Sequence, residues 1–287
     1  MTAPVLISGL SAVADRYDVL LSDVWGVIHN GRESFPAACE ALARWRAERG
    51  PVILISNSPR PSSAVHEQLD ELGVPREAWS AFVSSGDATR ILLSGRAPGP
   101  AWAIGPDRDF VLYEGLDLAF AGPEDAAFIS CTGPVDDEVE GPDDYEERFK
   151  TTIARGLPMI CANPDIVVQR GDKLIYCGGA LAQRYEQLGG QVIMAGKPHA
   201  PIYDLCLGEA QVLLGKHIDR SRVLCIGDAV ATDAKGANDQ ELDVLFVASG
   251  IHGAETIGED GLDASAVERL LAKDGARATY AIADLAW

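Results

Sequence analysis

Short apolar runs alternate with segments of helical spacing at both ends of the chain. In the first part they predict strands at 19–22, 51–56 and 81–84 and helices at 36–49, 62–72 and 87–93. In the last part they predict strands at 192–195, 223–226, 244–247 and 280–282 and helices at 201–214, 233–241 and 266–273. This alternation is typical of an α/β fold in which helices cover a doubly wound parallel sheet.

The pattern changes at the proline- and glycine-rich segment 95–100. The middle of the chain predicts strands at 101–104, 110–113, 127–131 and 159–162, helices at 143–155 and 178–188, and a hairpin of 166–169 with 173–176 across Arg170-Gly171-Asp172. The acidic stretch 136–147 predicts a solvated loop that leads into a helix. We therefore expect a Rossmann-like core domain formed by 1–86 and 191–287, with an inserted α/β domain at 87–190.

Composition narrows the function classes. The chain has 287 residues, 47% of them hydrophobic, and a net charge of −19, which argues against a nucleic-acid-binding surface. The six cysteines lack zinc-site or redox-pair spacing, so we expect reduced thiols in the core. No apolar run reaches the ~18 residues of a membrane span, and the first residues do not resemble a signal peptide. The expected location is the cytoplasm, without a membrane partner.

Four polar clusters each follow a short apolar run. They are Asp23-Val24-Trp25-Gly26, Ser56-Asn57-Ser58, Gly196-Lys197-Pro198, and Gly227-Asp228 with Asp233. In a doubly wound sheet the carboxyl ends of the strands meet at one edge, where ligands bind. If these strands are parallel, we expect the four clusters to share one crevice.

These residue types suit phosphoryl transfer, which depends on positioning and charge neutralisation. Asp23 and Asp228 offer hard oxygen ligands for Mg²⁺, and the backbone carbonyl of Trp25 offers a third. Lys197 would neutralise phosphate charge. Ser56 and the backbone amides of Asn57 and Ser58 would donate to phosphate oxygens. Each aspartate also has a structural interpretation, as a turn residue or helix cap, when it is taken alone.

In this order, the four clusters resemble the haloacid dehalogenase-like (HAD) hydrolase superfamily. The runs 55–60 (Ile-Ser-Asn-Ser-Pro-Arg), 162–165 (Ala-Asn-Pro-Asp) and 195–199 (Ala-Gly-Lys-Pro-His) resemble its class IIA branch of nitrophenyl-phosphatase-like and sugar-phosphatase-like proteins. The resemblance implies a Mg²⁺-dependent phosphatase of a small phosphorylated metabolite, with an inserted cap domain. It implies the aspartyl-phosphate nucleophile at Asp23, the hydroxyl of the second motif at Ser56, the lysine of the third at Lys197, a metal ligand at Asp228 and a supporting metal-site acid at Asp233.

The chain departs from this family at Trp25. Phosphatases of the family have an aspartate two residues after the nucleophile, which protonates the leaving group and later activates water. An indole N–H cannot do this at neutral pH. Two interpretations stay open: a slow phosphatase, or a non-catalytic phosphate- or metabolite-binding protein with the same fold. A metal-free dehalogenase is disfavoured, because the paired acids Asp228 and Asp233 need a cation beside an anionic substrate.

Several further assignments stay open. His29 is the only side chain of the first loop that titrates near pH 7, but a structural role in the loop is the simpler interpretation. Asn163 and Asp165 either face the active site or form a turn around Pro164. Trp25 fills an apolar gap, walls off the crevice or stacks on a substrate ring. The sequence leaves the substrate unidentified and a homo-oligomer open.

Overall fold

The computed structural model describes residues 3–170, 173–259 and 261–287. The chain forms two compact units. The first unit consists of Met1–Ser56, His66–Val83 and Tyr203–Trp287, and the second consists of Asn57–Val65 and Ser84–Ile202. Among the described helices, none is both long and apolar enough to cross a membrane.

In the described residues, the first unit is built on a seven-stranded sheet with the order β1-β15-β12-β11-β2-β3-β4. Its strands are β1 (Val5–Leu6), β2 (Val19–Ser22), β3 (Val52–Ser56), β4 (Ala81–Ser84), β11 (Val223–Gly227), β12 (Asp243–Val247) and β15 (Tyr280–Ile282). Parallel pairing joins β2 to β3 and to β11, and β12 to β11 and to β15. The predicted parallel α/β core is therefore confirmed.

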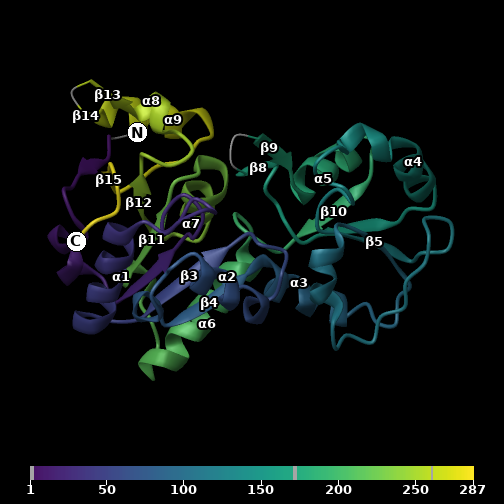
Figure 1. Cartoon of the computed structure of the whole chain (residues 1–287), viewed down its shortest axis with the longest axis horizontal. Coiled ribbons are helices and arrows are strands. Elements are labelled where there is room, and N and C mark those ends of the chain that lie inside the picture. The colour runs from purple at the N-terminus through teal and green to yellow at the C-terminus, as the bar shows by residue number, and fades with distance from the viewer. Residues whose placement is uncertain (1–2, 171–172, 260) are drawn as a thin grey trace. The chain divides into compact units, whose positions relative to one another are not determined.

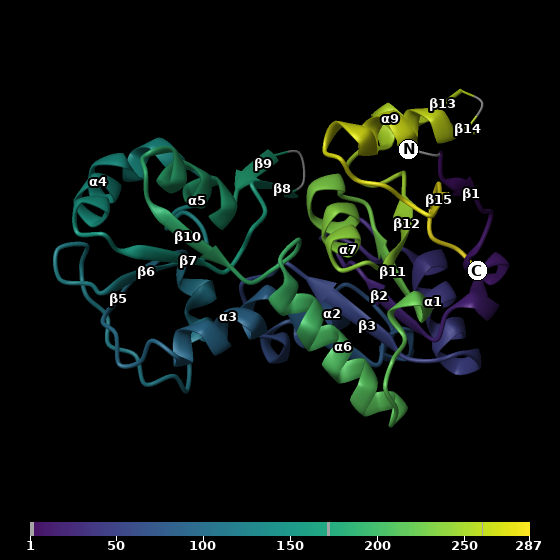
Figure 2. The ribbon, with the colours of Figure 1, turned by 180° about the vertical axis from the view of Figure 1, so that it is seen from behind.

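Helices pack along this sheet, as the two opposite views in Figures 1 and 2 show. They are α1 (Pro36–Glu48), α2 (His66–Glu71), α6 (Ala200–Leu214), α7 (Lys235–Asp239), α8 (Gly253–Thr256) and α9 (Ala264–Lys273). Helix α1 has Pro36 at its start and buries Ala38, Ala41, Leu42 and Trp45, a spacing that places them on one helical face. A small hairpin of β13 (Ile257–Gly258) and β14 (Gly261–Leu262) follows α8.

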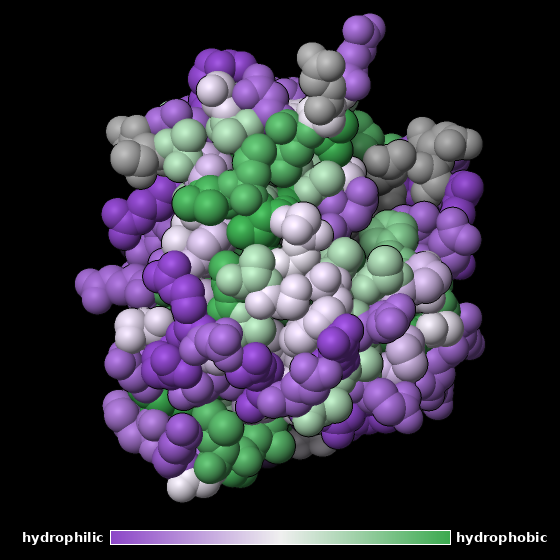
Figure 3. Space-filling view, turned by 90° about the vertical axis from the view of Figure 1, so that its left-hand side faces the viewer, coloured by the Kyte–Doolittle hydropathy of each residue, from purple (hydrophilic) through white to green (hydrophobic). Residues whose placement is uncertain are grey.

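Apolar side chains gather on the face of the first unit that Figure 3 shows. Strand β1 lies at the edge of the sheet, and its residues Val5 and Leu6 are 59% and 44% exposed. An open sheet edge can pair with another strand, but β1 is only two residues long, which limits such pairing.

The second unit contains a parallel sheet of four strands in the order β10-β7-β6-β5, counted over its described residues. The strands are β5 (Ala101–Ile104), β6 (Phe128–Cys131), β7 (Pro158–Cys161) and β10 (Gln191–Met194), and the helices are α3 (Ser85–Ser94), α4 (Glu146–Ala154) and α5 (Gly178–Gln187). The core between sheet and helices contains large aromatic side chains: Trp102, Tyr145, Phe149 and Tyr185.

The antiparallel hairpin of β8 (Val167–Arg170) and β9 (Lys173–Tyr176) confirms the predicted pairing. Its predicted turn at Gly171 and Asp172 lies outside the described residues.

Two predictions about individual segments are wrong. The apolar run 110–113 is part of a 3₁₀ helix, Asp107–Tyr113, because a four-residue apolar run does not distinguish a strand from a helical turn. Strand β10, which the sequence assigned to the core, pairs with β7 in the second sheet. Periodicity indicates that a segment is a buried strand, but it carries no information on which sheet the strand joins. The domain boundaries at residues 87 and 190 stay a prediction. The two compact units of the structure divide the chain at other residues.

Candidate active site

Asp23 is the first residue after β2, in the middle of the seven-stranded sheet. All four residues of β2 are buried, as expected for a strand covered on both faces. The backbone N–H of Asp23 donates to Ile226 O of β11 at 2.8 Å, which ties the end of β2 to its neighbour. The residue is 8% exposed. The local fold therefore holds one carboxylate at the carboxyl edge of the sheet, as the apolar run predicted.

The loop after Asp23 turns at Gly26, whose φ of +80° favours glycine. A Cβ atom at Gly26 would lie 2.2 Å from Asp228 Oδ2, so only glycine lets the loop pass so close to this carboxylate. The Gly26 N–H donates to His29 O at 2.8 Å and closes the turn. The turn after β2 and the carboxylate after β11 are thus in direct contact.

Asp228 follows β11 and is 5% exposed. Its Oδ2 accepts a hydrogen bond from the Ile251 N–H at 2.8 Å, and a Cβ atom at Gly250 would lie 2.0 Å from the same oxygen. The loop after β12 therefore approaches Asp228 from another side. The absence of a side chain at Gly26 and at Gly250 thus leaves room for the Asp228 carboxylate.

Asp233 lies in a short π-helical turn, Val230–Ala234, that leads into α7. Its Oδ2 accepts from the Ala229 N–H at 3.1 Å, and a Cβ atom at Gly227 would lie 2.3 Å from its carboxyl carbon. Single π turns in helices occur frequently at functional sites. Here the turn places Asp233 back against the end of β11 rather than on the helix surface.

Three carboxylates therefore converge in the first unit. Asp23, Asp228 and Asp233 are all buried, and each offers one oxygen within 4.8 Å of the others. Two oxygens on opposite sides of one Mg²⁺ ion are about 4.2 Å apart, twice the Mg–O distance of ~2.1 Å. The three oxygens thus span the size of a single divalent-ion site. Carboxylates this close repel one another, and a hard cation between them removes that repulsion. The donor set fits Mg²⁺.

Trp25 packs back onto its own loop. Its indole lies against Gly31: a Cβ atom at Gly31 would be only 2.3 Å from the Trp25 Cη2 atom. The ring meets His29 edge to face at 5.2 Å between centroids. His29 is buried, its Nδ1 accepts from the Gly31 N–H at 3.1 Å, and burial lowers the pKa of its imidazole to about 4. His29 is thus neutral at pH 7 and cannot replace the missing acid as a proton donor.

Ser56 is the last residue of β3, which pairs in parallel with β2. It therefore stands at the same carboxyl edge as Asp23. Ser58 follows in the second unit, where its Oγ accepts from the Arg60 N–H at 3.3 Å and its carbonyl accepts from the Gly86 N–H.

Lys197 follows β10 in the second unit and is 3% exposed. Asn57 fixes its backbone: Asn57 Oδ1 accepts from the Lys197 N–H at 2.7 Å, and Asn57 Nδ2 donates to Lys197 O at 3.1 Å. Asn57 Nδ2 also donates to Asp165 Oδ1 at 2.8 Å, and Asn163 Oδ1 accepts from the Asp165 N–H. Both ends of the Asn57 side-chain amide thus bind protein groups. Asn163 and Asp165 form a turn around Pro164, which was one of the two interpretations of these residues.

Sequence reasoning missed two contributors to the acidic site. The backbone of Gly250 and Ile251 contacts Asp228. The sequence signal for this contact was Gly250 itself, a glycine just beyond the predicted strand at 244–247. Tyr203 of α6 is almost fully buried, and its pKa is raised well above its ordinary value by burial first and by neighbours that include Asp233 and Asp23. Nothing in the helical pattern of α6 distinguished this tyrosine from a core residue.

Comparisons with known proteins agree with this geometry. A family model described as haloacid dehalogenase-like hydrolase matches residues 20–118, and a second, HAD-hydrolase-like model matches residues 194–284. A solved haloacid dehalogenase-like hydrolase from Brucella suis is 45% identical, with a TM-score of 0.87, over 98% of this chain and 100% of that one. This chain belongs to the haloacid dehalogenase-like hydrolases. The resemblance inferred from the four clusters is confirmed.

Two curated relatives of this hydrolase have named activities. A 5′-nucleotidase of Bacillus subtilis is 25% identical over 85% of this chain and 92% of its own length. A glycerol-3-phosphate phosphatase of Gallus gallus is 26% identical over 86% of this chain and 84% of its own length. The family resemblance thus extends over the inserted segment as well as the core.

Proposed function

We propose that this hydrolase is a Mg²⁺-dependent phosphatase of small phosphorylated metabolites, with Asp23 as its covalent nucleophile. The observation that carries the proposal is the convergence of Asp23, Asp228 and Asp233 within 4.8 Å at the carboxyl edge of the sheet. Phosphoryl transfer needs few groups beyond a nucleophile and charge neutralisation. This edge offers a carboxylate as nucleophile and further carboxylates that would hold a neutralising cation. The named activities of the two curated relatives, both on phosphate esters, support the same reaction class.

In the proposed reaction an Asp23 oxygen attacks phosphorus, and the bond from phosphorus to the ester oxygen breaks. The leaving oxygen takes a proton from solvent water. A second water then attacks the aspartyl-phosphate, gives its proton back to solvent, releases phosphate and restores the carboxylate. Asp23, Asp228, Asp233 and the Trp25 carbonyl would hold Mg²⁺, which would neutralise charge on the phosphoryl oxygens. We propose that Ser56 and the amides of Asn57 and Ser58 donate to those oxygens and that Lys197 adds a positive charge.

The direct test is phosphate release. We expect the purified protein to release phosphate from glycerol 3-phosphate and p-nitrophenyl phosphate when Mg²⁺ is present. Excess EDTA should stop the release and added Mg²⁺ should restore it, because the buried carboxylates repel the substrate without a cation. Phosphate release that continues unchanged in EDTA would contradict the metal requirement, whereas halide release from a haloacid in EDTA would revive the dehalogenase hypothesis.

The close contact between Gly250 and the Asp228 carboxylate gives a second prediction. In Gly250→Ala the new methyl group collides with Asp228 Oδ2, so the carboxylate must move. We expect Mg²⁺ affinity to fall ~10-fold or more, as for other changes to groups that support a metal ligand. Titration calorimetry with Mg²⁺ measures this without substrate. Gly258→Ala is the matched control, because a Cβ atom there meets nothing within 4 Å. Equal Mg²⁺ affinities of the two variants would show that Asp228 is not a ligand.

One observation favours a second candidate function. Trp25 stands where a catalytic acid is expected, and its ring packs on its own loop next to a neutral histidine. A protein that binds a phosphorylated metabolite without turning it over would need no acid there. Such a protein would bind phosphate esters saturably and release no phosphate from any of them. Hydrolysis that depends on Asp23 excludes this candidate.

A further inference from the structure

The loop after β2 is built around the indole of Trp25. Gly31 has a φ of +82°, and a Cβ atom there would lie 2.3 Å from Trp25 Cη2 and 2.6 Å from Trp25 Cζ2. His29 meets the indole edge to face, and its carbonyl accepts from the Gly26 N–H at 2.8 Å. A side chain at position 31 would displace the ring, so glycine there makes room for it. The loop thus holds an indole two residues after Asp23, where phosphatases of this family have an aspartate.

Three other side chains that could carry a proton lie on the segments around the acidic site, and each is engaged within the protein. His29 is 3% exposed, and its Nδ1 accepts a backbone N–H at 3.1 Å. Tyr203 is 1% exposed, and its hydroxyl donates to a backbone carbonyl at 3.4 Å. His252 follows the residue whose N–H binds Asp228, and its Nδ1 lies 3.4 Å from Glu255 Oε1. These contacts give each of the three a structural role.

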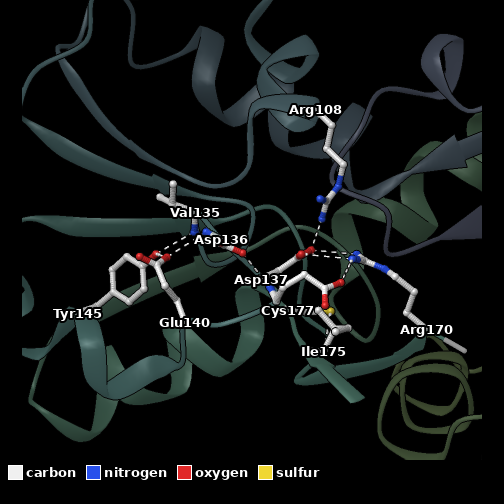
Figure 4. Close-up of polar contacts among 10 residues, drawn as sticks. Arg108, Val135, Asp136, Asp137, Glu140, Tyr145, Arg170, Ile175 and Cys177 are labelled. Atoms are coloured by element: carbon white, nitrogen blue, oxygen red, sulfur yellow. Dashed lines mark hydrogen bonds and ion pairs between the residues drawn. The ribbon is translucent and has the colours of Figure 1, made fainter. Parts of the chain in front are cut away.

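The acids after β6 are bound by donors, as Figure 4 shows for Asp137 and Glu140. Arg170 binds Asp137 with both terminal nitrogens, at 2.9 Å and 3.2 Å, and Arg108 donates to the same carboxylate. Burial alone raises the pKa of Asp137, but hydrogen bonds from Arg170 and Arg108 bring it below its ordinary value. The Tyr145 hydroxyl donates to Glu140 at 2.5 Å and, with backbone N–H groups, lowers the pKa of that carboxyl too. Both carboxyls are thus ionised at neutral pH and have no proton to give.

The missing proton matters for some leaving groups and not for others. An alkoxide is about as basic as hydroxide, whose parent water has a pKa of ~15.7, so an alkyl ester needs an acid to release it. A phenol has a pKa of ~10 and a carboxylic acid one of ~4, so a carboxylate leaves readily as an anion. In an acyl phosphate the Asp23 oxygen bonds to phosphorus, the bond from phosphorus to the acyl oxygen breaks, and the carboxylate leaves with the electron pair. This step moves no proton.

We propose that this hydrolase acts on acyl phosphates, the mixed anhydrides of a carboxylic acid and phosphoric acid, in preference to alkyl phosphates. The inference rests on the proposed phosphatase function and narrows its substrate class. Trp25 is the specificity-determining residue, because it occupies the place of the acid that alkyl esters require. The aspartyl-phosphate formed on Asp23 is itself an acyl phosphate, so the first step exchanges one carboxylate for another of similar basicity.

The second step has a consequence that can be measured. Water attacks the phosphorus of the aspartyl-phosphate, its proton passes to solvent, and the Asp23 carboxylate leaves. Without a base to take that proton the step is slow, so the phosphorylated protein accumulates. With p-nitrophenyl phosphate we expect a burst of about one p-nitrophenolate per protein molecule, followed by a slower steady rate. A linear time course from the first turnover would contradict this expectation and the missing base with it.

The main test compares leaving groups. We expect kcat/KM for acetyl phosphate to exceed that for glycerol 3-phosphate by ~10²-fold or more, the lower limit of what general acid catalysis usually contributes. In a series of substituted phenyl phosphates of similar size, kcat/KM should rise steeply as the phenol becomes more acidic. Equal values for acetyl phosphate and glycerol 3-phosphate would show that an acid protonates the leaving oxygen, which refutes the inference.

Three variants identify such an acid if it exists. Trp25→Phe keeps an aromatic ring but removes the indole N–H, and we expect the same ratio of kcat/KM between the two substrates, whatever its overall activity. His252→Gln tests the one partly exposed imidazole of the three side chains above, and Asp109→Asn tests a buried carboxyl of the second unit whose pKa burial raises. Both should keep the wild-type ratio. A loss for glycerol 3-phosphate alone in any of the three would assign the proton to that residue and refute the inference.

An exchange measurement separates this inference from the proposed function. Protein with Mg²⁺, acetyl phosphate and isotopically labelled acetate should form labelled acetyl phosphate, because acetate can attack the aspartyl-phosphate and release the Asp23 carboxylate without a proton. Asp23→Asn should remove the exchange. If exchange occurs without net phosphate release, the phosphatase function fails and the acyl phosphate specificity stands. If glycerol 3-phosphate and acetyl phosphate are hydrolysed with equal kcat/KM and no exchange occurs, the specificity is refuted and the phosphatase function stands.

Discussion

Asp23→Asn should abolish phosphate release, with a loss of at least ~10³-fold, because the side-chain amide is not a nucleophile and cannot form the aspartyl-phosphate. Asp23 and Asn have almost the same shape, so the hydrogen bond from the Asp23 N–H to Ile226 O should be retained. Steady-state assays with saturating Mg²⁺ measure the loss. Acid quenching during turnover, followed by mass spectrometry, should find the phosphoryl group on Asp23 in the wild-type protein and nowhere in the variant.

A matched control separates this loss from a general effect of removing a negative charge. Asp204 of α6 is exposed in the same unit, and Asp204→Asn should leave turnover within ~2-fold, as is usual for surface changes. Thermal unfolding of both variants shows whether the fold is intact. Turnover of Asp23→Asn at the wild-type rate would refute the nucleophile assignment, and phosphate on another residue would transfer the role to that residue.

Much of the first unit was predictable because its central strands are buried on both faces. Strands β2, β3 and β11 are mostly apolar runs. The polar residues that the sequence singled out, Asp23, Ser56 and Asp228, lie at the last position of such a strand or directly after it. In a parallel sheet, neighbouring strands that end together bring such residues together, so their convergence followed from the pattern. The position of Asp233 was harder to predict, because its contact with Gly227 depends on a π-helical turn that the hydrophobic periodicity does not indicate.

The second unit was less predictable for physical reasons. The run 110–113 and strand β10 are short apolar segments whose type or partner depends on tertiary packing. The acidic stretch after β6 has a composition typical of solvated loops, yet Tyr145 orders it and two arginines cover Asp137. These contacts join residues that are far apart in sequence, and charge composition alone cannot show which acid is buried. The same holds for Tyr203, whose nearness to the acidic site is a property of the fold.

Trp25→Asp should raise turnover of alkyl phosphates about 10²-fold, because it supplies the acid that protonates the leaving oxygen, a contribution usually worth ~10²–10⁴-fold. An alkoxide needs that proton, whereas p-nitrophenolate leaves readily as an anion. The gain should therefore be large for glycerol 3-phosphate and small for p-nitrophenyl phosphate. In the wild-type protein the same reasoning predicts a strong preference for p-nitrophenyl phosphate.

Trp25→Asn is the control that isolates the proton. It removes the indole from Gly31 and His29 and opens the same space, but its amide does not titrate near neutral pH. If only the aspartate variant gains activity, and the gain needs Asp23, then the indole replaces a catalytic acid in an otherwise competent site. Equal gains in both variants would mean that the indole limits access rather than chemistry. No gain in either would place the slow step elsewhere and favour a protein whose task is to bind its phosphorylated ligand.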